Sequence, residues 1–298
     1  MRRTLGAATL TAVAAVLAGH HRARRAVARQ PAFAPELPGR KKIVPTDWGS
    51  VAYRHLTAQD PTAPALVLVH GWGRTADTAW WRLFPFLRGE VVAVDLPGHG
   101  MSELHAPFTF ERAAEAVRTA AVDAGLQRPA LVAHSMGEAV ALEAAAADPA
   151  GFCHLVAIGT SAFWVRPRTR LMMSAAPFVL GDRSPFVVRS LHRTFRSDPE
   201  TAPVVAWAHA VRPRRRILVE SAWALRRFDA RDRRLRLPPT TWVVTRHDTV
   251  LAPRFQRASA ALVRAAVVEI DAEHSAPLTD PALVAEVIES ALLGHRVA

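Results

Sequence analysis

The chain has 298 residues, of which 50% are hydrophobic and 21% charged, with 15 Gly and 22 Pro. This composition excludes wholesale disorder and a collagen-like repeat, and the length allows one large α/β domain or two small ones. Because Cys153 is the single cysteine, an internal disulfide framework and a zinc site built from cysteines are both excluded.

Two segments carry the net charge of +12. Residues 1–42 have a balance of +8 and residues 161–238 a balance of +11, whereas residues 43–160 and 239–298 are mildly acidic. A solvated, arginine-rich surface explains such an excess without any ligand. Nucleic-acid binding is not expected, because the sequence has no recognition module for it.

The first 25 residues form a segment of their own. Arg2 and Arg3 precede an apolar run over residues 5–19, and a basic cluster follows it. The run is shorter than the ~20 residues of a membrane-spanning helix and is similar to a signal-peptide core. Basic residues directly after such a run disfavour export. We therefore expect an uncleaved, membrane-associating segment with the rest of the chain cytoplasmic; the alternative is export after cleavage.

From residue 43 onward, short β-branched runs alternate with helical periodicity, a pattern typical of a mostly parallel α/β sheet. The expected strands are Ile43–Pro45, Ser50–Arg54, Ala65–Val69, Val91–Val94, Ala130–Ala133, Leu155–Ile158, Thr241–Thr245 and Ala266–Ile270, the first two forming a hairpin. The expected helices between and after them are Phe110–Ala121, Met136–Ala147 and Pro281–Leu293.

Between Ile158 and Thr241 the sequence lacks a strand signal over about eighty residues. Its pieces have helical spacing over residues 170–180, 185–195, 202–211 and 214–228. An insertion of this kind after the sixth strand predicts a helical lid over one edge of the sheet.

The sharpest motif is Ala133-His134-Ser135-Met136-Gly137, placed between a buried strand and a helix. A nucleophilic serine needs a tight, strained strand-to-helix turn with small neighbours. At the start of a helix, backbone N–H groups can also stabilise a developing oxyanion.

Four further motifs follow the expected order of such a site. His70-Gly71-Trp72-Gly73 and the turn over residues 95–102 (Asp-Leu-Pro-Gly-His-Gly-Met-Ser) each follow a strand, as do Asp248 and His274. With them the chain resembles the α/β-hydrolase fold superfamily, in its serine-nucleophile, esterase- and lipase-like branch with a helical cap. Two positions depart from the superfamily pattern: Ala133 replaces the first glycine of G-x-S-x-G, and Thr-Arg-His-Asp replaces Gly-x-x-Asp.

The resemblance implies a mostly parallel central sheet flanked by helices, and a role for each motif. Ser135 is the expected nucleophile, His274 its base and Asp248 the acid that orients His274, with the backbone N–H groups of Trp72 and Met136 as oxyanion donors. It also divides the chain. Residues 1–42 are the N-terminal segment and linker, 43–160 the first part of the core, 161–238 the arginine-rich lid, and 239–298 the second part of the core.

Other acids and histidines have simpler interpretations. We expect Asp271 and Glu273 to lie at the surface or behind the site, and His134 to pack under the turn. Glu138, where the superfamily often has glycine, is expected to favour the helix start through the macrodipole. Cys153 is expected to be a small buried residue.

The expected function is therefore cleavage of a carboxylic ester, with a hydrophobic acyl group, through an acyl-enzyme that needs no metal or cofactor. Several tryptophans could line an acyl pocket, although packing within the lid explains them equally well; they are Trp72, Trp80, Trp81, Trp164, Trp207 and Trp223. Acyl transfer, perhydrolysis, thioester or C–C bond hydrolysis, and a non-catalytic binding protein remain as alternatives. The basic segments are compatible with an anionic membrane surface as a partner. Acyl chain length, leaving group and oligomeric state stay open.

Overall fold

A computed structural model describes residues 34–164, 207, 211 and 213–294 of the chain. The predicted membrane-associating segment and most of the predicted lid therefore lie outside the described residues. Of the helical pieces expected in the lid, those over residues 170–180 and 185–195 are outside the described part, and the piece over residues 202–211 is described only at Trp207 and Val211.

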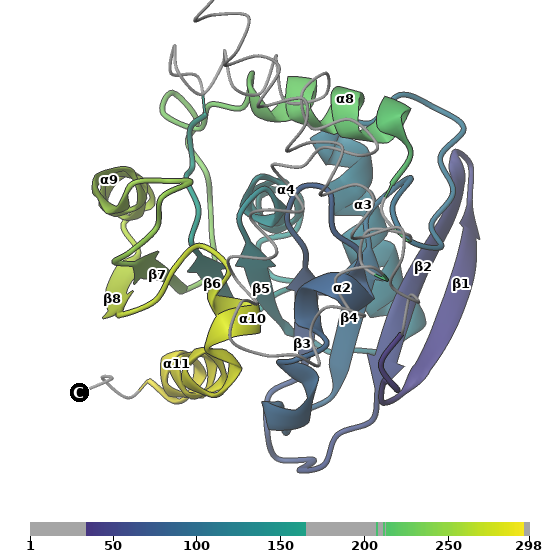
Figure 1. The fold of residues 1–298 in the computed structure, drawn as a ribbon, viewed down its shortest axis with the longest axis horizontal. Helices are drawn as coiled ribbons and strands as arrows, with labels where there is room; N and C mark the ends of the chain where they lie inside the picture. Colours follow the sequence, from purple (N-terminus) through teal and green to yellow (C-terminus); the bar gives the residue numbers. More distant parts are fainter. Residues whose placement is uncertain (1–33, 165–206, 208–210, 212, 295–298) are drawn as a thin grey trace, which may run out of the picture.

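One eight-stranded sheet forms the centre of the fold, in the order β1-β2-β4-β3-β5-β6-β7-β8. The strands are β1 (Arg40–Thr46), β2 (Gly49–Leu56), β3 (Leu66–Val69), β4 (Val91–Asp95), β5 (Ala130–His134), β6 (His154–Ile158), β7 (Thr240–Thr245) and β8 (Ala266–Ile270). The β1–β2 and β2–β4 pairs are antiparallel, and all other pairs are parallel. In Figure 1 the purple β1–β2 hairpin is one edge of this sheet and β8 is the other.

Alternation along the central strands explains why helices cover both faces. In β3, Val67 and Val69 belong to one apolar cluster, while Leu66 and Leu68 belong to another on the opposite face. Successive side chains of a strand point to opposite faces, so a strand apolar at every position must be buried on both sides. The two clusters are therefore the two halves of the core.

Three longer helices cover the first face: α3 (Phe110–Asp123), α4 (Gly137–Ala147) and α9 (Pro253–Val263). The other face is covered by α2 (Ala76–Trp80), the 3-10 turn η1 (Phe84–Phe86), α10 (Ala276–Thr279) and α11 (Pro281–Leu293). Helix α8 (Arg215–Leu225) lies across the top of α3 and α4 in Figure 1.

Local sequence signals set the bounds of α3. The Thr109 side chain accepts a hydrogen bond from the Arg112 backbone N–H at 3.2 Å, which caps the first turn. The helix ends before Gly125, whose φ of +75° is the left-handed conformation typical of a residue after a helix.

The predicted strands are all present, with ends that differ by one or a few residues. The hairpin is longer than expected, because its partners pair in register from Arg40↔His55 to Thr46↔Gly49. Helices α2, α9 and α10 were not predicted from the sequence, and the helix predicted over residues 214–228 extends only over Arg215–Leu225. Cys153 is only half-buried, against the expectation that it is buried.

Within the described part of the chain, no helix has both the length and the apolar character needed to cross a membrane. The same residues contain no group of three or more His, Cys, Asp or Glu side chains that could hold a metal ion.

Candidate active site

The turn that carries Ser135 joins β5 to α4. Ser135 has a φ of +54°, in the left-handed region that non-glycine residues rarely adopt. Two hydrogen bonds hold it there: its N–H donates to the Ile158 carbonyl at 3.1 Å, and the Thr160 hydroxyl donates to its carbonyl at 2.7 Å. A Cβ at Gly137 would come within 2.3 Å of the Val69 carbonyl oxygen, so the turn requires glycine there.

His274 and Asp248 are joined to Ser135 by a chain of hydrogen bonds. His274 Nε2 lies 3.0 Å from Ser135 Oγ, and His274 Nδ1 lies 2.8 Å from Asp248 Oδ2. Because a carboxylate only accepts, Nδ1 carries the proton and Nε2 is free to accept from the serine hydroxyl. The structure thus brings together the three residues that the sequence places at the ends of β5, β7 and β8.

Asp248 is buried but has a donor for each oxygen. The backbone N–H groups of Val250 and Leu251 donate to Oδ1 at 2.8 and 2.7 Å, and Thr245 Oγ1 and Gln256 Nε2 each donate to Oδ2 at 3.0 Å. Burial by itself raises the pKa of Asp248. The hydrogen bonds to the carboxylate, of which the one from His274 has the largest effect, outweigh burial and leave the pKa below its usual value. Asp248 is therefore ionised at neutral pH.

His134 supports the loop that carries His274. Its Nε2–H donates to the His274 backbone carbonyl at 2.7 Å, and the two rings lie 5.0 Å apart. Burial, with a smaller effect from His274, lowers the pKa of His134 to about 3, so this side chain stays neutral. The expectation that His134 packs under the turn did not include this contact.

Trp72 and Met136 lie on the two turns that meet at Ser135. A Cβ at Gly71 would come within 3.1 Å of Ser135 Cβ, so the turn before α2 lies against the turn that carries Ser135. Neither the Trp72 nor the Met136 backbone N–H has a hydrogen-bond acceptor among the residues described. Two free N–H groups on adjoining turns are the kind of donor that binds an oxyanion.

The turn that begins at Asp95 is held by hydrogen bonds to the Asp95 carboxylate. Asp95 is fully buried and accepts from the Ala76 N–H at 2.7 Å, the Met101 N–H at 3.1 Å and Lys41 Nζ at 2.7 Å. Burial raises the pKa of Asp95, and the Lys41 ammonium opposes that rise. Gly100 lies so close to Asp95 that a Cβ would sit 2.3 Å from its carboxyl carbon. The turn is structural, as its sequence indicates.

Glu138, one turn of α4 after Ser135, does not fit its predicted role. Its side chain is fully buried, and neither carboxyl oxygen has a hydrogen-bond partner within the described chain. Burial raises the pKa of Glu138 well above its usual value and so favours the neutral form of the side chain. The neutral form gains little from the helix dipole, so this burial argues against the role expected from the sequence.

The tryptophans predicted near the mouth have different surroundings. Trp80 is fully buried in the core, with its ring centroid 6.3 Å from that of His134 in an edge-to-face arrangement, and Trp223 on α8 is 41% exposed. Trp72 is partly exposed and donates its Nε1–H to the Leu218 carbonyl at 3.1 Å. Of these three, only Trp72 lies on a turn beside Ser135.

Asp271 lies at the surface, as expected for an acid with no part in the site. It accepts from His247 Nε2 at 2.7 Å, and both side chains are largely exposed. The contributions of Gln256 and Thr160 to the site were not predicted from the sequence. Thr160 comes two residues after β6, so its position after a strand could have indicated it. Gln256 lies within α9, where no such signal exists.

Comparison with known proteins agrees with this architecture. The model of the alpha/beta hydrolase family matches residues 66–287, and the chain belongs to this family. A pimeloyl-[acyl-carrier protein] methyl ester esterase of Methylococcus capsulatus is 40% identical over 108 residues, which are 35% of this chain and 40% of that protein. The match thus spans about two fifths of the length of this curated relative.

Solved structures extend the similarity over the fold. A hydrolase from Pseudomonas aeruginosa is 26% identical, with a TM-score of 0.72 over 86% of this chain and 99% of the other. The enol-lactonase of Burkholderia xenovorans is 19% identical, with a TM-score of 0.73 over 85% of this chain and 100% of the other, and shows the fold alone.

Proposed function

We propose that this protein is a serine hydrolase that cleaves a carboxylic ester through an acyl-enzyme on Ser135. The observation that carries the proposal is the hydrogen-bonded chain from Ser135 Oγ through His274 to the buried Asp248 carboxylate. An isolated serine hydroxyl is a weak nucleophile, and a base in this position activates it.

Each step of the proposed ester hydrolysis uses a side chain or backbone group of the site described above. His274 Nε2 accepts the Ser135 proton while Oγ bonds to the ester carbonyl carbon, and the Trp72 and Met136 N–H groups stabilise the oxyanion that forms. When the intermediate collapses, the C–O bond to the alcohol breaks and His274 returns the proton to that alcohol. Water then attacks the acyl-enzyme by the same route, which releases the acid and restores Ser135.

The names of relatives support ester chemistry. The Methylococcus capsulatus protein is named as a methyl ester esterase, and the Pseudomonas aeruginosa structure is named as a hydrolase. We extend from them only the bond type, a carboxylic ester of a small molecule.

Labelling with a fluorophosphonate tests the nucleophile directly. Wild-type protein should be labelled and should hydrolyse 4-nitrophenyl esters, Ser135→Ala should lose both, and His274→Ala should lower kcat on the order of 10⁶-fold. Matched controls are Ser290→Ala on α11 and His247→Ala at the surface, which should keep both activities. Folded wild-type protein without labelling or turnover would refute the proposal.

The same assay separates hydrolysis from the alternative reactions. Added methanol or hydrogen peroxide competes with water for the acyl-enzyme, and analysis of the products shows which acceptor the site prefers. A product mixture dominated by the added acceptor at low concentration would favour acyl transfer or perhydrolysis over ester hydrolysis.

We also propose association with an anionic membrane surface, on the basis of the basic, apolar N-terminal segment and the basic residues 161–238. The full-length protein and a variant lacking residues 1–30 should then partition differently between the cytosolic and membrane fractions. Identical partition would refute the association.

A further inference from the structure

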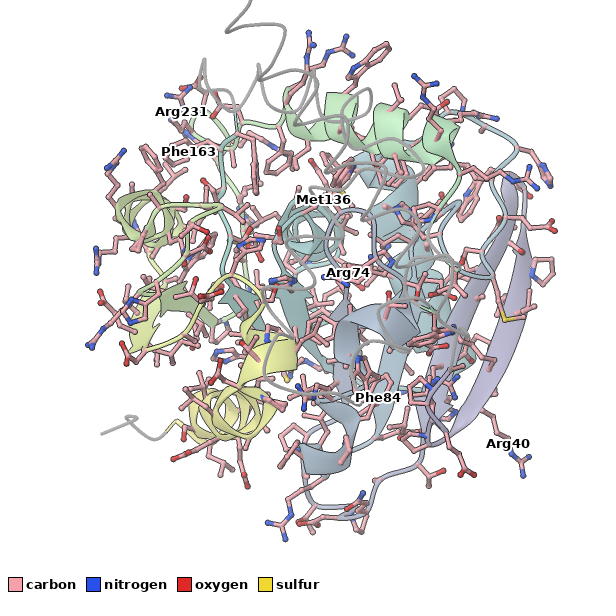
Figure 2. All side chains as sticks on the ribbon, in the orientation of Figure 1. Arg40, Arg74, Phe84, Met136, Phe163 and Arg231 are labelled. Atoms are coloured by element: carbon pink, nitrogen blue, oxygen red, sulfur yellow. The ribbon has the colours of Figure 1, made fainter. Side chains whose placement is uncertain are left out.

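A positively charged side chain, Arg74, lies beside the proposed site and has no part in the steps above. It follows Trp72 by two residues, in the connection between β3 and α2 (Figure 2). Its backbone N–H donates to the Gly71 carbonyl at 3.4 Å and closes the turn that carries the Trp72 oxyanion donor.

This turn is held between the nucleophile and α8. Gly71 lies against Ser135, while a Cβ at Gly73 would lie 3.4 Å from a methyl group of Leu218 and the Trp72 ring bonds to the Leu218 carbonyl. The Arg74 charge also acts on the histidines around the site, since it helps to lower the pKa values of His70 and His134. The backbone of Arg74 is therefore part of a turn that packs against Ser135.

The guanidinium of Arg74 has no hydrogen-bond or ion-pair partner among residues 34–164, 207, 211 and 213–294. Other arginines form ion pairs, such as Arg54 with Asp77, Arg233 with Glu143 and Arg257 with Glu269. Arg74 is only partly exposed, yet within the described residues its side chain makes neither an ion pair nor a hydrogen bond. Burial lowers its pKa to about 10, so it remains charged at neutral pH. A cation withdrawn from water without a counter-charge is unfavourable, and a bound anion would relieve that cost.

We propose that Arg74 binds an anionic group of the substrate, next to the carbonyl that Ser135 attacks. This inference rests on the proposed ester hydrolysis and adds a substrate class to it: esters that also carry a carboxylate or a phosphate. A guanidinium presents its N–H donors in a planar fork that matches two oxygens of either anion. The substrate then carries a charged group, in contrast to the sequence-based expectation of a hydrophobic acyl ester.

Two esters with six-carbon acyl chains test the proposal: the mono-4-nitrophenyl ester of adipic acid, whose chain ends in a carboxylate, and 4-nitrophenyl hexanoate, whose chain ends in a methyl group. In Arg74→Leu, kcat/KM for the adipate ester should fall about 10- to 100-fold, the effect of one or two charge-assisted hydrogen bonds, while the hexanoate ester changes little. Arg74→Lys should recover part of the loss, because it keeps the charge without the fork. The matched control is Arg118→Leu on α3, a partly exposed arginine outside the site, which should leave both esters unaffected.

Binding without turnover keeps this test separate from the proposed hydrolysis. Adipate, the uncharged six-carbon hexanamide and inorganic phosphate are titrated into wild type and Arg74→Leu, with tryptophan fluorescence or calorimetry as the readout. Adipate or phosphate should bind more tightly than hexanamide, and Arg74→Leu should lose that preference by a similar factor. The anion that binds more tightly identifies the group.

The outcomes distinguish the two proposals. If wild type hydrolyses both esters and Arg74→Leu keeps their ratio, the anion site is refuted while ester hydrolysis stands. If neither ester is hydrolysed and Ser135 is not labelled, the hydrolysis proposal fails, and the binding titrations still decide the role of Arg74. Equal binding of adipate by wild type and Arg74→Leu, with no Arg74-dependent phosphate binding, would overturn the inference.

Discussion

The side chain of His134 donates a hydrogen bond to the backbone carbonyl of His274, 2.7 Å away. The residue just before the proposed nucleophile therefore holds the main chain of the proposed base, although 140 positions separate them in the sequence. In this way the β5–α4 turn and the loop after β8 are fixed to each other by a contact besides the Ser135–His274 bond itself.

His134→Phe should lower kcat about 10-fold, because it keeps a ring of similar size but removes the donor that fixes the His274 backbone. KM should change little, since His134 supports the base and is not expected to contact substrate. Steady-state kinetics on a 4-nitrophenyl ester measures both values. His134→Gln, which retains a donor, should recover part of the rate, and unchanged kcat in His134→Phe would show that the contact has no influence on catalysis.

Thr245→Val should weaken the network around Asp248. It removes the hydroxyl that donates to Asp248 Oδ2 at 3.0 Å, so the carboxylate is less well stabilised and its pKa rises toward the usual value. A carboxyl group whose pKa is lowered by folding stabilises the protein above its unfolded pKa, and that stability is lost as the pH falls through the folded pKa.

The expected cost of Thr245→Val is about 1 kcal/mol of unfolding free energy at pH 7, and the difference from wild type should shrink at low pH. Urea unfolding at pH 7 and near pH 3 measures it. A cost independent of pH would mean that the variant disturbs packing and not the charge of Asp248.

Glu138→Gln should remove a pH dependence of stability. Because burial raises the pKa of Glu138 above its usual 4.5, the folded protein keeps the proton that the unfolded chain has lost. The unfolding free energy should therefore fall by about 1.4 kcal/mol for each pH unit above 4.5, until the folded pKa is reached. Glu138→Gln cannot ionise and should be more stable than wild type at pH 8, with the two nearly equal at pH 4.

Thermal or urea unfolding between pH 4 and pH 8 tests this expectation, with Glu286→Gln, an exposed glutamate of α11, as the control for loss of one carboxylate. If the difference between wild type and Glu138→Gln does not grow with pH, Glu138 has a partner in the folded protein.

Lys41→Met should destabilise the fold by about 3–5 kcal/mol, because it leaves the buried Asp95 carboxylate without its counter-charge. Burial already raises the pKa of Asp95, and loss of Lys41 raises it further, so the variant should lose stability as the pH increases. Lys42→Met is the matched control, since Lys42 is exposed and forms no ion pair in the described structure. Similar unfolding midpoints for the two variants in guanidinium chloride would contradict this account of Asp95.

Prediction from sequence worked where a residue follows a buried strand. Ser135, Asp248 and His274 each come within four residues of the end of a strand, and in a parallel sheet the carboxyl ends of neighbouring strands meet at one edge. The sheet brings these three residues close together, so their positions after strands were enough to predict that they meet.

Other features depend on contacts that leave no local pattern. Gln256 reaches Asp248 from α9, a helix that begins at Pro253 and that the sequence analysis did not assign. Glu138 looked like an ordinary helix-start acid, because its burial depends on what packs over α4. In the sequence Arg74 cannot be told apart from the many other arginines; only the structure shows that it has no carboxylate partner among the described residues.

Because the ribosome synthesises the chain from its N-terminus, the distance in sequence between Ser135 and His274 affects when the site can form. Their side chains form a hydrogen bond although they are 139 positions apart in the sequence, so the ribosome adds the serine well before the histidine. At about 5–20 residues per second the delay is on the order of ten seconds. During that time the emerging chain holds Ser135 without its proposed base, and the proposed acyl transfer to this serine must wait until β8 has paired with β7.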